Sequence, residues 1–328
     1  MQLSELKKCM KGVMVVQTTP FNKDGSLDLE GMRANTRWLV ERMAGKDFSF
    51  VPFGSTGEFY AMSDDECKVA IKMVVEEVKG KNVMLAGTGR AGTPETIKMC
   101  QYAESVGADG VQVVLPYYHI PTEEGMYQHY KQVAESVNIG IMIYNNPDTS
   151  GSWINPPLMA KLSKIPNIIG VKENTLDVGA YYAMQRTVDP KDAVVLCGQG
   201  EQLFSFEAVY GCPGYVSGMA NFAPDLSYSL YEAAVARDFN KVADIVNSKA
   251  PYSSFINKAI ENHGSLTLRR TISGGVGAGE SSMFIAVHKA SMDIIGLRGG
   301  EVRLPAVGLT DEEKAELRDV LRTMKLVN

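Results

Sequence analysis

The stretch Asn167-Ile168-Ile169-Gly170-Val171-Lys172 is a short apolar run that ends in a lysine. Its β-branched residues favour a strand, and because consecutive rather than alternate positions are apolar, we expect both faces of that strand to be buried. Seven similar runs occur elsewhere among the 328 residues, at 13–17, 48–53, 83–86, 110–115, 140–144, 193–197 and 215–217. Eight such strands indicate a sheet that is covered by helices.

Segments with helical periodicity lie between the strands. Examples are found at 29–43, 64–78, 94–106, 123–136 and 157–163. This alternation predicts an α/β fold with a parallel sheet, and eight units within about 235 residues match a (β/α)8 TIM barrel. An open doubly wound sheet is the alternative, because periodicity counts the units without showing that the sheet closes.

Only helical patterns follow the eighth strand. They predict helices at 226–237, 239–248, 254–262, 283–295 and 310–324. We therefore expect a barrel domain over residues 1–235, which carries the active site, and a C-terminal helical region over residues 236–328. The segment 264–282 is rich in Gly and Ser and is expected to be a long loop. Its glycines do not form a phosphate-binding fingerprint, because no strand precedes them and no Gly-Lys-Ser/Thr follows.

Composition argues against several classes of function. The formal net charge is −5 and the basic residues are scattered, so we expect no nucleic-acid partner. No apolar run approaches the roughly 20 residues that span a bilayer, and no signal-peptide pattern is present, so no membrane association is expected. The five cysteines and four histidines show no metal-ligand spacing. We expect a soluble cytoplasmic protein with no metal site, in which His129, on a helix, lies at the surface.

Lys172 ends its strand where a barrel places its chemistry, since reacting groups lie at the C-terminal ends of strands and in the loops that follow. A lysine in apolar surroundings either extends its charge into solvent or serves as a nucleophile, and the run alone leaves both open. Tyr118, after the fourth strand, and Tyr144, at the end of the fifth, are expected at the same rim. Either tyrosine taken alone is more typical of aromatic packing at a strand end than of catalysis.

Tyr144 and Lys172 are 28 residues apart, which is about one β/α unit. They are therefore expected to end adjacent strands at the same level of the barrel. A neutral lysine amine attacks a ketone to form an imine, and a neighbouring phenol can supply the proton transfers that this reaction needs. The protonated imine then acts as an electron sink for C–C cleavage, for loss of a proton or for elimination of a hydroxyl.

The turn Gly54-Ser55-Thr56-Gly57-Glu58 follows the second strand. Its backbone amides and two hydroxyls can converge on a carboxylate. The alternative is a tight strand-to-helix turn before a helix capped by Ser63 or Asp64, which explains the glycines but not the adjacent Ser and Thr.

The chain resembles the dihydrodipicolinate synthase and N-acetylneuraminate lyase superfamily of Schiff-base-forming 2-oxo-acid aldolases and dehydratases, because six motifs occur in the order typical of that superfamily. Besides the turn they are Thr18-Thr19-Pro20-Phe21 with Asp24-Gly25, Pro116-Tyr117-Tyr118, Tyr144-Asn145-Asn146-Pro147, Gly170-Val171-Lys172-Glu173 and Gly299-Gly300-Glu301-Val302-Arg303-Leu304-Pro305. They span nearly the whole chain.

The resemblance implies a cofactor-free enzyme in which Lys172 forms the imine with a pyruvate-like substrate and Tyr144 is the general acid and base. It implies that Ser55 and Thr56 bind the substrate carboxylate and link Tyr144 into a proton relay. Tyr118 of a neighbouring subunit would complete that relay, within a homotetramer built as a dimer of dimers.

Other positions bear on the rest of the substrate. The resemblance implies that the backbone near Val216 faces the imine. The run Gly198-Gln199-Gly200-Glu201 offers amide and carboxylate groups that suit polyol hydroxyls. In the lysine-pathway synthases of the family an arginine stands two residues after the proline that follows the tyrosine, where this chain has Thr149. An uncharged residue cannot hold a carboxylate in a bidentate fork.

We therefore expect a lyase, either an aldolase or a dehydratase, that acts on a pyruvate-type 2-oxo acid and prefers a 2-oxo-3-deoxy sugar acid. The first alternative is a 4-hydroxy-tetrahydrodipicolinate synthase, which condenses pyruvate with aspartate semialdehyde. The second is a catalytically silent barrel that only binds a 2-oxo acid. A metal-dependent aldolase is disfavoured by the spacing of the histidines.

Overall fold

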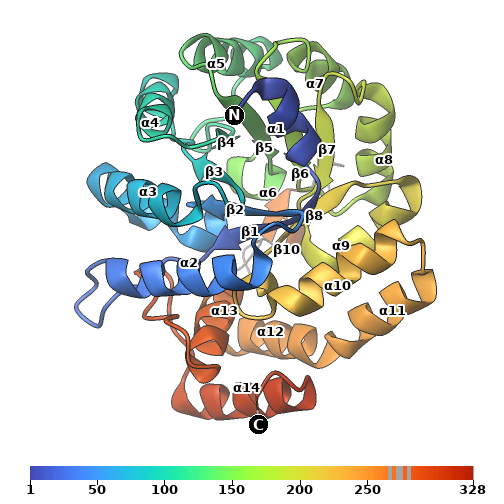
Figure 1. Cartoon of the computed structure of the whole chain (residues 1–328). Coiled ribbons are helices and arrows are strands. Elements are labelled where there is room, and N and C mark those ends of the chain that lie inside the picture. Colours follow the sequence, from blue (N-terminus) through green and yellow to red (C-terminus); the bar gives the residue numbers. More distant parts are fainter. Residues whose placement is uncertain (265–267, 271–275, 279–281, 328) are drawn as a thin grey trace.

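Eight parallel strands form a closed barrel in the computed structural model, which describes residues 1–264, 268–270, 276–278 and 282–327 (Figure 1). Each strand pairs with its neighbours in chain order, and β1 also pairs with β8, where Gly12 lies opposite Gly214. This closure excludes the open sheet and confirms the predicted TIM barrel. The strands are β1 (Gly12–Gln17), β2 (Phe48–Pro52), β3 (Val83–Gly87), β4 (Gly110–Val114), β5 (Gly140–Asn145), β6 (Ile168–Glu173), β7 (Val194–Cys197) and β8 (Gly214–Ser217).

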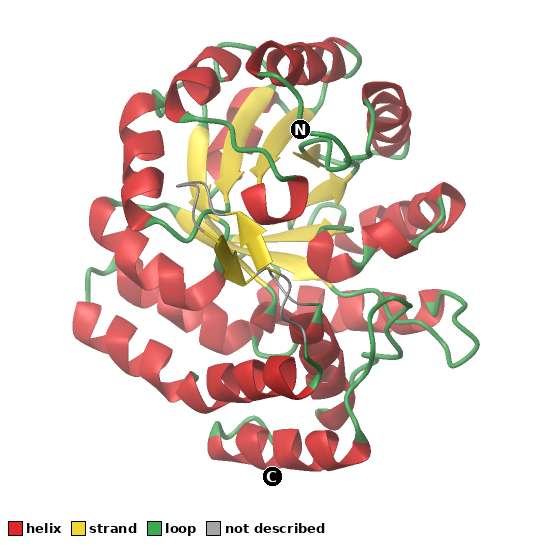
Figure 2. Cartoon of the chain, turned by 180° about the vertical axis from the view of Figure 1, so that it is seen from behind, coloured by secondary structure: helices red, strands yellow, loops and turns green. Residues whose placement is uncertain are grey.

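Helices surround the barrel and bury apolar faces against it (Figure 2). The five helices predicted between strands are present within one residue of their expected bounds. Within the described residues, no helix combines the length and the apolar character needed to cross a membrane. The helices around the barrel are α2 (Leu29–Met43), α3 (Asp64–Val78), α4 (Thr93–Ser105), α5 (Glu123–Glu135), the one-turn α6 (Pro147–Ser150), α7 (Pro156–Leu162), α8 (Val178–Thr187), α9 (Gly200–Glu207) and α10 (Pro224–Val235).

A helix that the sequence patterns do not predict, α1 (Leu3–Cys9), lies at the N-terminal ends of the strands. Leu6 and Met10 are buried and join the apolar cluster that fills the barrel interior. Leu6 packs on Gly140, the first residue of β5. Seven residues contain too few apolar positions for a helical period to be recognised. The helix closes the barrel at the end opposite to the strand C-termini.

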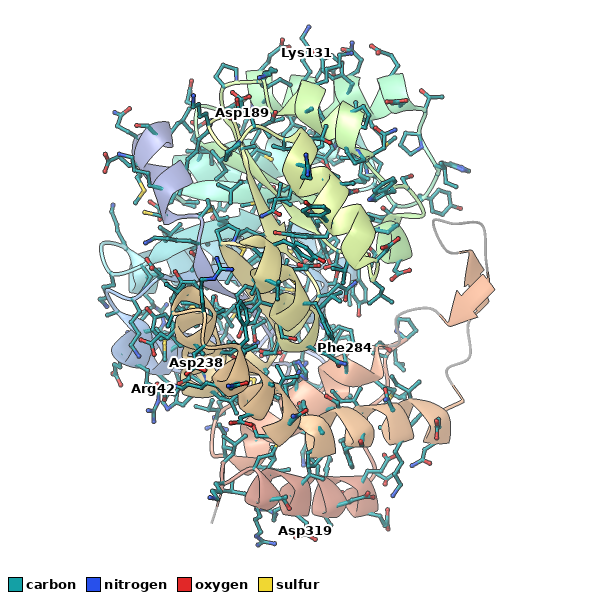
Figure 3. The ribbon with its side chains drawn as sticks, turned by 90° about the vertical axis from the view of Figure 1, so that its right-hand side faces the viewer. Arg42, Lys131, Asp189, Asp238, Phe284 and Asp319 are labelled. Carbon is teal, nitrogen blue, oxygen red and sulfur yellow. The ribbon has the colours of Figure 1, made fainter. Side chains whose placement is uncertain are left out.

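The C-terminal region is helical, as predicted, and its helices lie side by side next to the barrel (Figure 1). The last three of these helices share a second apolar core with Met219 and Phe222, which come directly after β8, whereas the first of them packs against the main core around the barrel. Phe284, near the start of α13, lies where these helices meet the barrel (Figure 3). The expected domain boundary falls between α10 and α11, and this division stays a prediction. The helices are α11 (Phe239–Ser248), α12 (Ala250–Asn262), α13 (Met283–Ile294) and α14 (Asp311–Thr323).

The segment 264–282, expected to be a loop throughout, contains two short antiparallel strands, β9 (Leu268–Arg270) and β10 (Val276–Ala278). The loop prediction is wrong for these residues, because a strand of three residues is too short to show an alternating pattern. Of the rest of the predicted loop, residues 264 and 282 form turns, and residues 265–267, 271–275 and 279–281 lie outside the described residues.

A buried ion pair joins the C-terminal region to the barrel. The Nζ of Lys289, in α13, lies 2.6 Å from Oε1 of Glu58 and 2.9 Å from the carbonyl oxygen of Thr19. The other carboxylate oxygen of Glu58 accepts a hydrogen bond from the backbone N–H of Arg303 at 3.1 Å. The side chains of Lys289 and Glu58 are 1% and 0% exposed. Separating the pair would leave two buried charges without an opposite charge beside them, so the pair holds α13 and the turn after β2 in one arrangement.

Replacement of Lys289 by Met should lower the free energy of unfolding by about 3–5 kcal/mol, because the charge of Glu58 would remain buried without its partner. Lys258→Met is the matched control. It removes the same group from an exposed pair with Glu316, for which the expected loss is below about 1 kcal/mol. Urea unfolding followed by circular dichroism measures both losses. Equal losses would contradict the role of the pair, and adding Glu58→Gln to Lys289→Met should restore part of the stability.

Candidate active site

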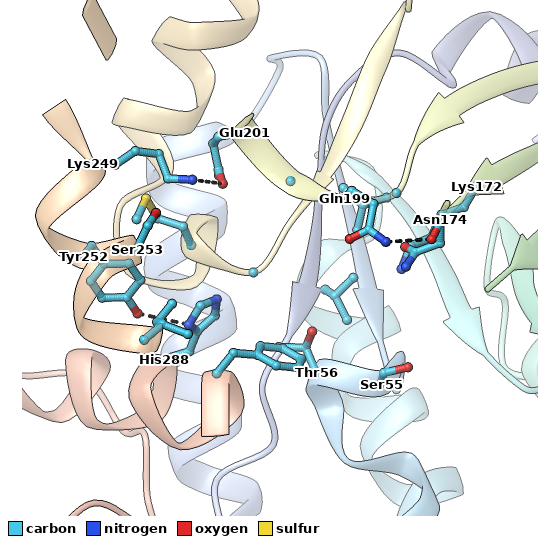
Figure 4. Close-up of a pocket in the computed structure, with 18 of the residues that line it drawn as sticks. Ser55, Thr56, Lys172, Asn174, Gln199, Glu201, Lys249, Tyr252, Ser253 and His288 are labelled. Carbon is cyan, nitrogen blue, oxygen red and sulfur yellow. Dashed lines mark hydrogen bonds and ion pairs between the residues drawn. The ribbon is translucent and has the colours of Figure 1, made fainter. Parts of the chain in front are cut away.

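A cavity of about 180 Å³ lies at the C-terminal ends of the strands, between the barrel loops and helices α12 and α13 (Figure 4). Its lining includes residues that come from β1, β5, β6 and β8. Tyr118, one of the residues predicted for the site, does not line it. The other six predicted residues do, and these are Lys172, Tyr144, Ser55, Thr56, Gly198 and Val216.

The amine of Lys172 lies against the ring of Tyr144. The pairing of β5 with β6 places these two residues opposite each other. The Nζ of Lys172 is 3.6 Å from the centroid of the Tyr144 ring, and both side chains are buried. The amine and the phenol therefore share one wall of the cavity.

The hydroxyl of Tyr144 lies between two polar side chains. Oγ of Ser55 is 3.3 Å away, and Nδ2 of Asn146 donates to it at 2.8 Å. The side-chain carbonyl of Asn146 accepts from the backbone N–H groups of Asp148 and Thr149, because Asn146 caps α6. The cap fixes the amide so that its NH₂ faces Tyr144. Asn146 is not among the site residues predicted from the sequence, although an Asn directly before Pro is a recognisable cap signal.

The turn that carries Ser55 and Thr56 packs closely on β1. A Cβ on Gly54 would lie 2.6 Å from Val16, and one on Gly57 would lie 2.8 Å from the carbonyl oxygen of the last residue of the strand. The glycines are therefore explained by close approach of the backbone, as in the alternative explanation of this turn. The two hydroxyls are not needed for that approach, and both residues line the cavity.

On the other side of the cavity a carboxylate is paired with an ammonium (Figure 4). Glu201, in α9, lies 3.4 Å from the Nζ of Lys249, and its other oxygen accepts from Ser217 at 2.5 Å and from Ser227 at 2.9 Å. Burial raises the pKa of Glu201, but the charge of Lys249 and the hydroxyl donors outweigh burial, and the pKa lies below its usual value. Glu201 is thus a carboxylate whose oxygens are already engaged.

Tyr118 lies outside the cavity of its own chain. Its side chain is 81% exposed, and its ring meets that of His119 edge to face, with centroids 4.9 Å apart. Its expected place in the proton relay therefore requires a second subunit and stays a prediction.

His129 is buried rather than exposed, so the prediction of a surface position is wrong. Its ring lies on the inward face of α5, where Nδ1 is 2.9 Å from Oγ1 of Thr93. Burial lowers the pKa of His129 to about 4. In the described part of the chain, no group of three His, Cys, Asp or Glu residues is placed to hold a metal ion.

Comparison with known proteins shows the family to which this chain belongs. Residues 9–263 match the model of the Dihydrodipicolinate synthetase family. A 4-hydroxy-tetrahydrodipicolinate synthase of Pelagibacter ubique is 33% identical over 322 residues, which cover 97% of this chain and 99% of that protein.

Two solved structures extend the comparison. YagE, a prophage protein of E. coli K12 that belongs to the dihydrodipicolinic acid synthase family and was solved in complex with pyruvate, has a TM-score of 0.83 and 29% identity over 97% of this chain and 99% of its own. A monomeric dihydrodipicolinate synthase variant has a TM-score of 0.81 and 28% identity over 97% and 98% of the two chains. The chain therefore belongs to the dihydrodipicolinate synthetase family of barrel lyases.

Proposed function

We propose that this protein is a Schiff-base-forming lyase that cleaves or dehydrates a 2-oxo-3-deoxy sugar acid. The observation that carries the proposal is the contact between Lys172 and Tyr144, with Nζ 3.6 Å from the ring centroid, inside the cavity at the strand ends. An amine beside a phenol provides the nucleophile and the proton donor that imine formation requires.

The chemistry begins when the neutral amine of Lys172 adds to C2 of the 2-oxo acid. Proton transfers through Tyr144 and loss of water give the protonated imine. In cleavage, Tyr144 takes the proton of the C4 hydroxyl, the C3–C4 bond breaks, and its electrons move into the imine to form an enamine as the aldehyde leaves. In dehydration, a C3 proton leaves first and the enamine expels the C4 hydroxyl as water. After cleavage, the enamine takes a proton at C3 from Tyr144 and returns to the imine. Hydrolysis of the imine then restores the amine in both reactions, and no cofactor is needed because the imine is the electron sink.

The substrate carboxylate lies at Ser55 and Thr56 in this proposal. The backbone N–H groups of Gly57 and Glu58 donate to carbonyl oxygens within the turn. The donors available to a carboxylate are therefore the hydroxyls and backbone amides of Ser55 and Thr56. Ser55 also connects the carboxylate site to Tyr144 through their 3.3 Å contact. Gly198 and Val216 line the same cavity. In this proposal the backbone near Val216 faces the imine, and the run that begins at Gly198 faces the polyol part of the substrate.

The proposed assembly is a homotetramer, a dimer of dimers, in which Tyr118 enters the site of a neighbouring subunit. The high exposure of Tyr118 in the single chain supports this, since an aromatic side chain on a rim loop gains from burial at an interface. The five cysteines are all free, which suits the reducing cytoplasm as the proposed location.

Lys172→Ala should abolish turnover and leave the thermal unfolding transition within a few degrees of the wild type, because it removes the nucleophile and leaves the apolar core around the barrel unchanged. Borohydride added with pyruvate should leave a mass adduct on Lys172 of the wild type and none on the variant. Lys249→Met, which changes another lysine of the same cavity, should retain the adduct. An adduct that follows Lys249 would contradict the mechanism, and ligand-induced stabilisation without any adduct would favour the silent binding barrel.

The second candidate is the 4-hydroxy-tetrahydrodipicolinate synthase reaction. The names of the curated relatives favour it, including the one from Pelagibacter ubique. Thr149 disfavours it, because this residue lies in α6 with its hydroxyl 3.3 Å from the carbonyl oxygen of Asn146 and offers no cationic fork to a second carboxylate.

An assay with pyruvate, aspartate semialdehyde and a downstream reductase compares the two candidates directly. We expect the rate to be about tenfold or more below the rate on 2-oxo-3-deoxy sugar acids, since the arginine fork is missing. Thr149→Arg should raise the synthase rate, whereas Asp148→Arg, which places the same guanidinium group one position away, should not. Equal rates on the two substrates in the wild type would reverse the ranking of the candidates.

A further inference from the structure

Three side chains on α12 and α13 form a hydrogen-bonded chain beside the cavity. The hydroxyl of Tyr252 lies 3.0 Å from Nδ1 of His288 (Figure 4) and 3.2 Å from Oγ of Ser291. Ser291 in turn donates to the carbonyl oxygen of Val287 at 2.8 Å. Tyr252 and His288 both line the cavity, and the proposed mechanism uses neither.

The carbonyl at the end of this chain fixes the direction of each proton. A carbonyl only accepts, so Ser291 donates to Val287 and is left to accept from Tyr252. Tyr252 thus donates its proton to Ser291 and accepts from Nδ1–H of His288. Burial lowers the pKa of His288 to about 4, so the ring is neutral at pH 7 and carries a single proton. That proton is on Nδ1, and Nε2 presents a lone pair.

The Nε2 of His288 lies beside a glycine, which has no side chain to cover it. A Cβ on Gly218, after β8, would lie 2.5 Å from Nε2. The φ of Gly218 is −81°, which any residue can adopt, so space rather than backbone conformation explains the glycine. Phe222 and Phe284 meet the imidazole edge to face, with centroids 5.8 and 5.7 Å away, and hold the ring in this orientation. The cavity wall thus contains a fixed acceptor.

Lys249 adds a donor to the same part of the cavity. An ammonium has three N–H groups, and Glu201 accepts from one of them at 3.4 Å. A hydroxyl both donates and accepts, so hydroxyls can bond to Nε2 of His288 and to the ammonium. A carboxylate only accepts, and it would face the lone pair of His288 and the negative charge of Glu201.

We propose that His288 and Lys249 form a subsite for the distal hydroxyls of the substrate chain, with Nε2 accepting from one hydroxyl and the ammonium donating to another. The inference rests on the proposed function and deepens it. It identifies neutral hydroxyl groups, and not a second terminal carboxylate, as what the protein recognises beyond the reacting carbons.

Borohydride trapping on the full-length protein tests the subsite without requiring turnover. Four acids are compared: pyruvate, which has no distal chain; 2-oxohexanoate, which has no hydroxyls; 2-oxo-3-deoxyhexonate; and the analogue of the latter with C6 oxidised to a carboxylate. The concentration that half-saturates the adduct on Lys172 is read by intact mass. For 2-oxo-3-deoxyhexonate we expect a value about tenfold or more below those of 2-oxohexanoate and the C6 carboxylate.

Two variants separate recognition from folding. His288→Leu removes the acceptor. The half-saturating concentration of 2-oxo-3-deoxyhexonate should therefore rise about tenfold, while that of pyruvate should stay within about twofold of the wild-type value. Tyr252→Phe keeps the aromatic ring at position 252 but leaves Nδ1 of His288 without its acceptor, which allows the tautomer with the proton on Nε2. The difference in half-saturating concentration between 2-oxo-3-deoxyhexonate and its C6 carboxylate analogue should then become smaller. If His288 and Tyr252 only supported the fold, their replacement would change the half-saturating concentrations of all four acids by the same factor. If circular dichroism shows that His288→Leu does not fold, Tyr252→Phe and the wild-type comparison still decide the question.

If the wild-type protein traps pyruvate normally, either of two results would overturn the proposed subsite. One is equal half-saturation by 2-oxo-3-deoxyhexonate and 2-oxohexanoate, and the other is tighter binding of the C6 carboxylate. A wild-type protein that forms no adduct even with pyruvate would overturn the proposed function, and this inference with it. The pyruvate arm therefore distinguishes the two failures.

Discussion

The pairing of β1 with β8 is the constraint on which the site depends. Closure brings the C-terminal ends of eight strands to one rim, so residues as distant in sequence as Ser55 and Val216 line a single cavity. The pairing of β5 with β6 then sets Lys172 beside Tyr144 at that rim. In an open sheet the first and last strands of such a series need not be neighbours, and the loops after β2 and β8 would not have to meet.

Closure alone does not complete the cavity, because one side of it comes from the C-terminal helices. Lys289 is bound to Glu58, which ends the turn that carries Ser55 and Thr56. The next residue toward the N-terminus of the same helix is His288. The ion pair therefore fixes the turn that carries Ser55 and Thr56 and the cavity wall that carries His288 relative to each other, although they belong to distant parts of the chain. This gives a physical reason to keep a buried ion pair, whose net contribution to stability need not be large.

The parts of this structure that could be predicted are local in sequence. Apolar runs gave the strands, and one β/α unit between Tyr144 and Lys172 predicted their proximity. The pair formed by Glu58 and Lys289 could not be predicted, because its partners are 231 residues apart and neither lies in a periodic pattern that indicates the other. His288 was missed for a related reason, since a histidine in a largely apolar helix resembles an ordinary core position until the barrel loops are placed against it. The seven residues of α1 were too short to show a period.

Two groups of hydrogen-bonded side chains lie around the cavity, and they differ in whether the direction of proton donation is fixed. Between Ser55 and Tyr144 either hydroxyl can donate, and the amide of Asn146 supports the Tyr144 oxygen in both cases. A proton can therefore shift in either direction there, which imine formation and hydrolysis both require. The chain that includes His288 ends at a backbone carbonyl, so its protons have a single direction. Reversible transfer suits catalysis and a fixed acceptor suits recognition. Because the two groups lie on different elements, the proposed function implies that changes in α12 and α13 alter the substrate chain that is accepted without disturbing Lys172.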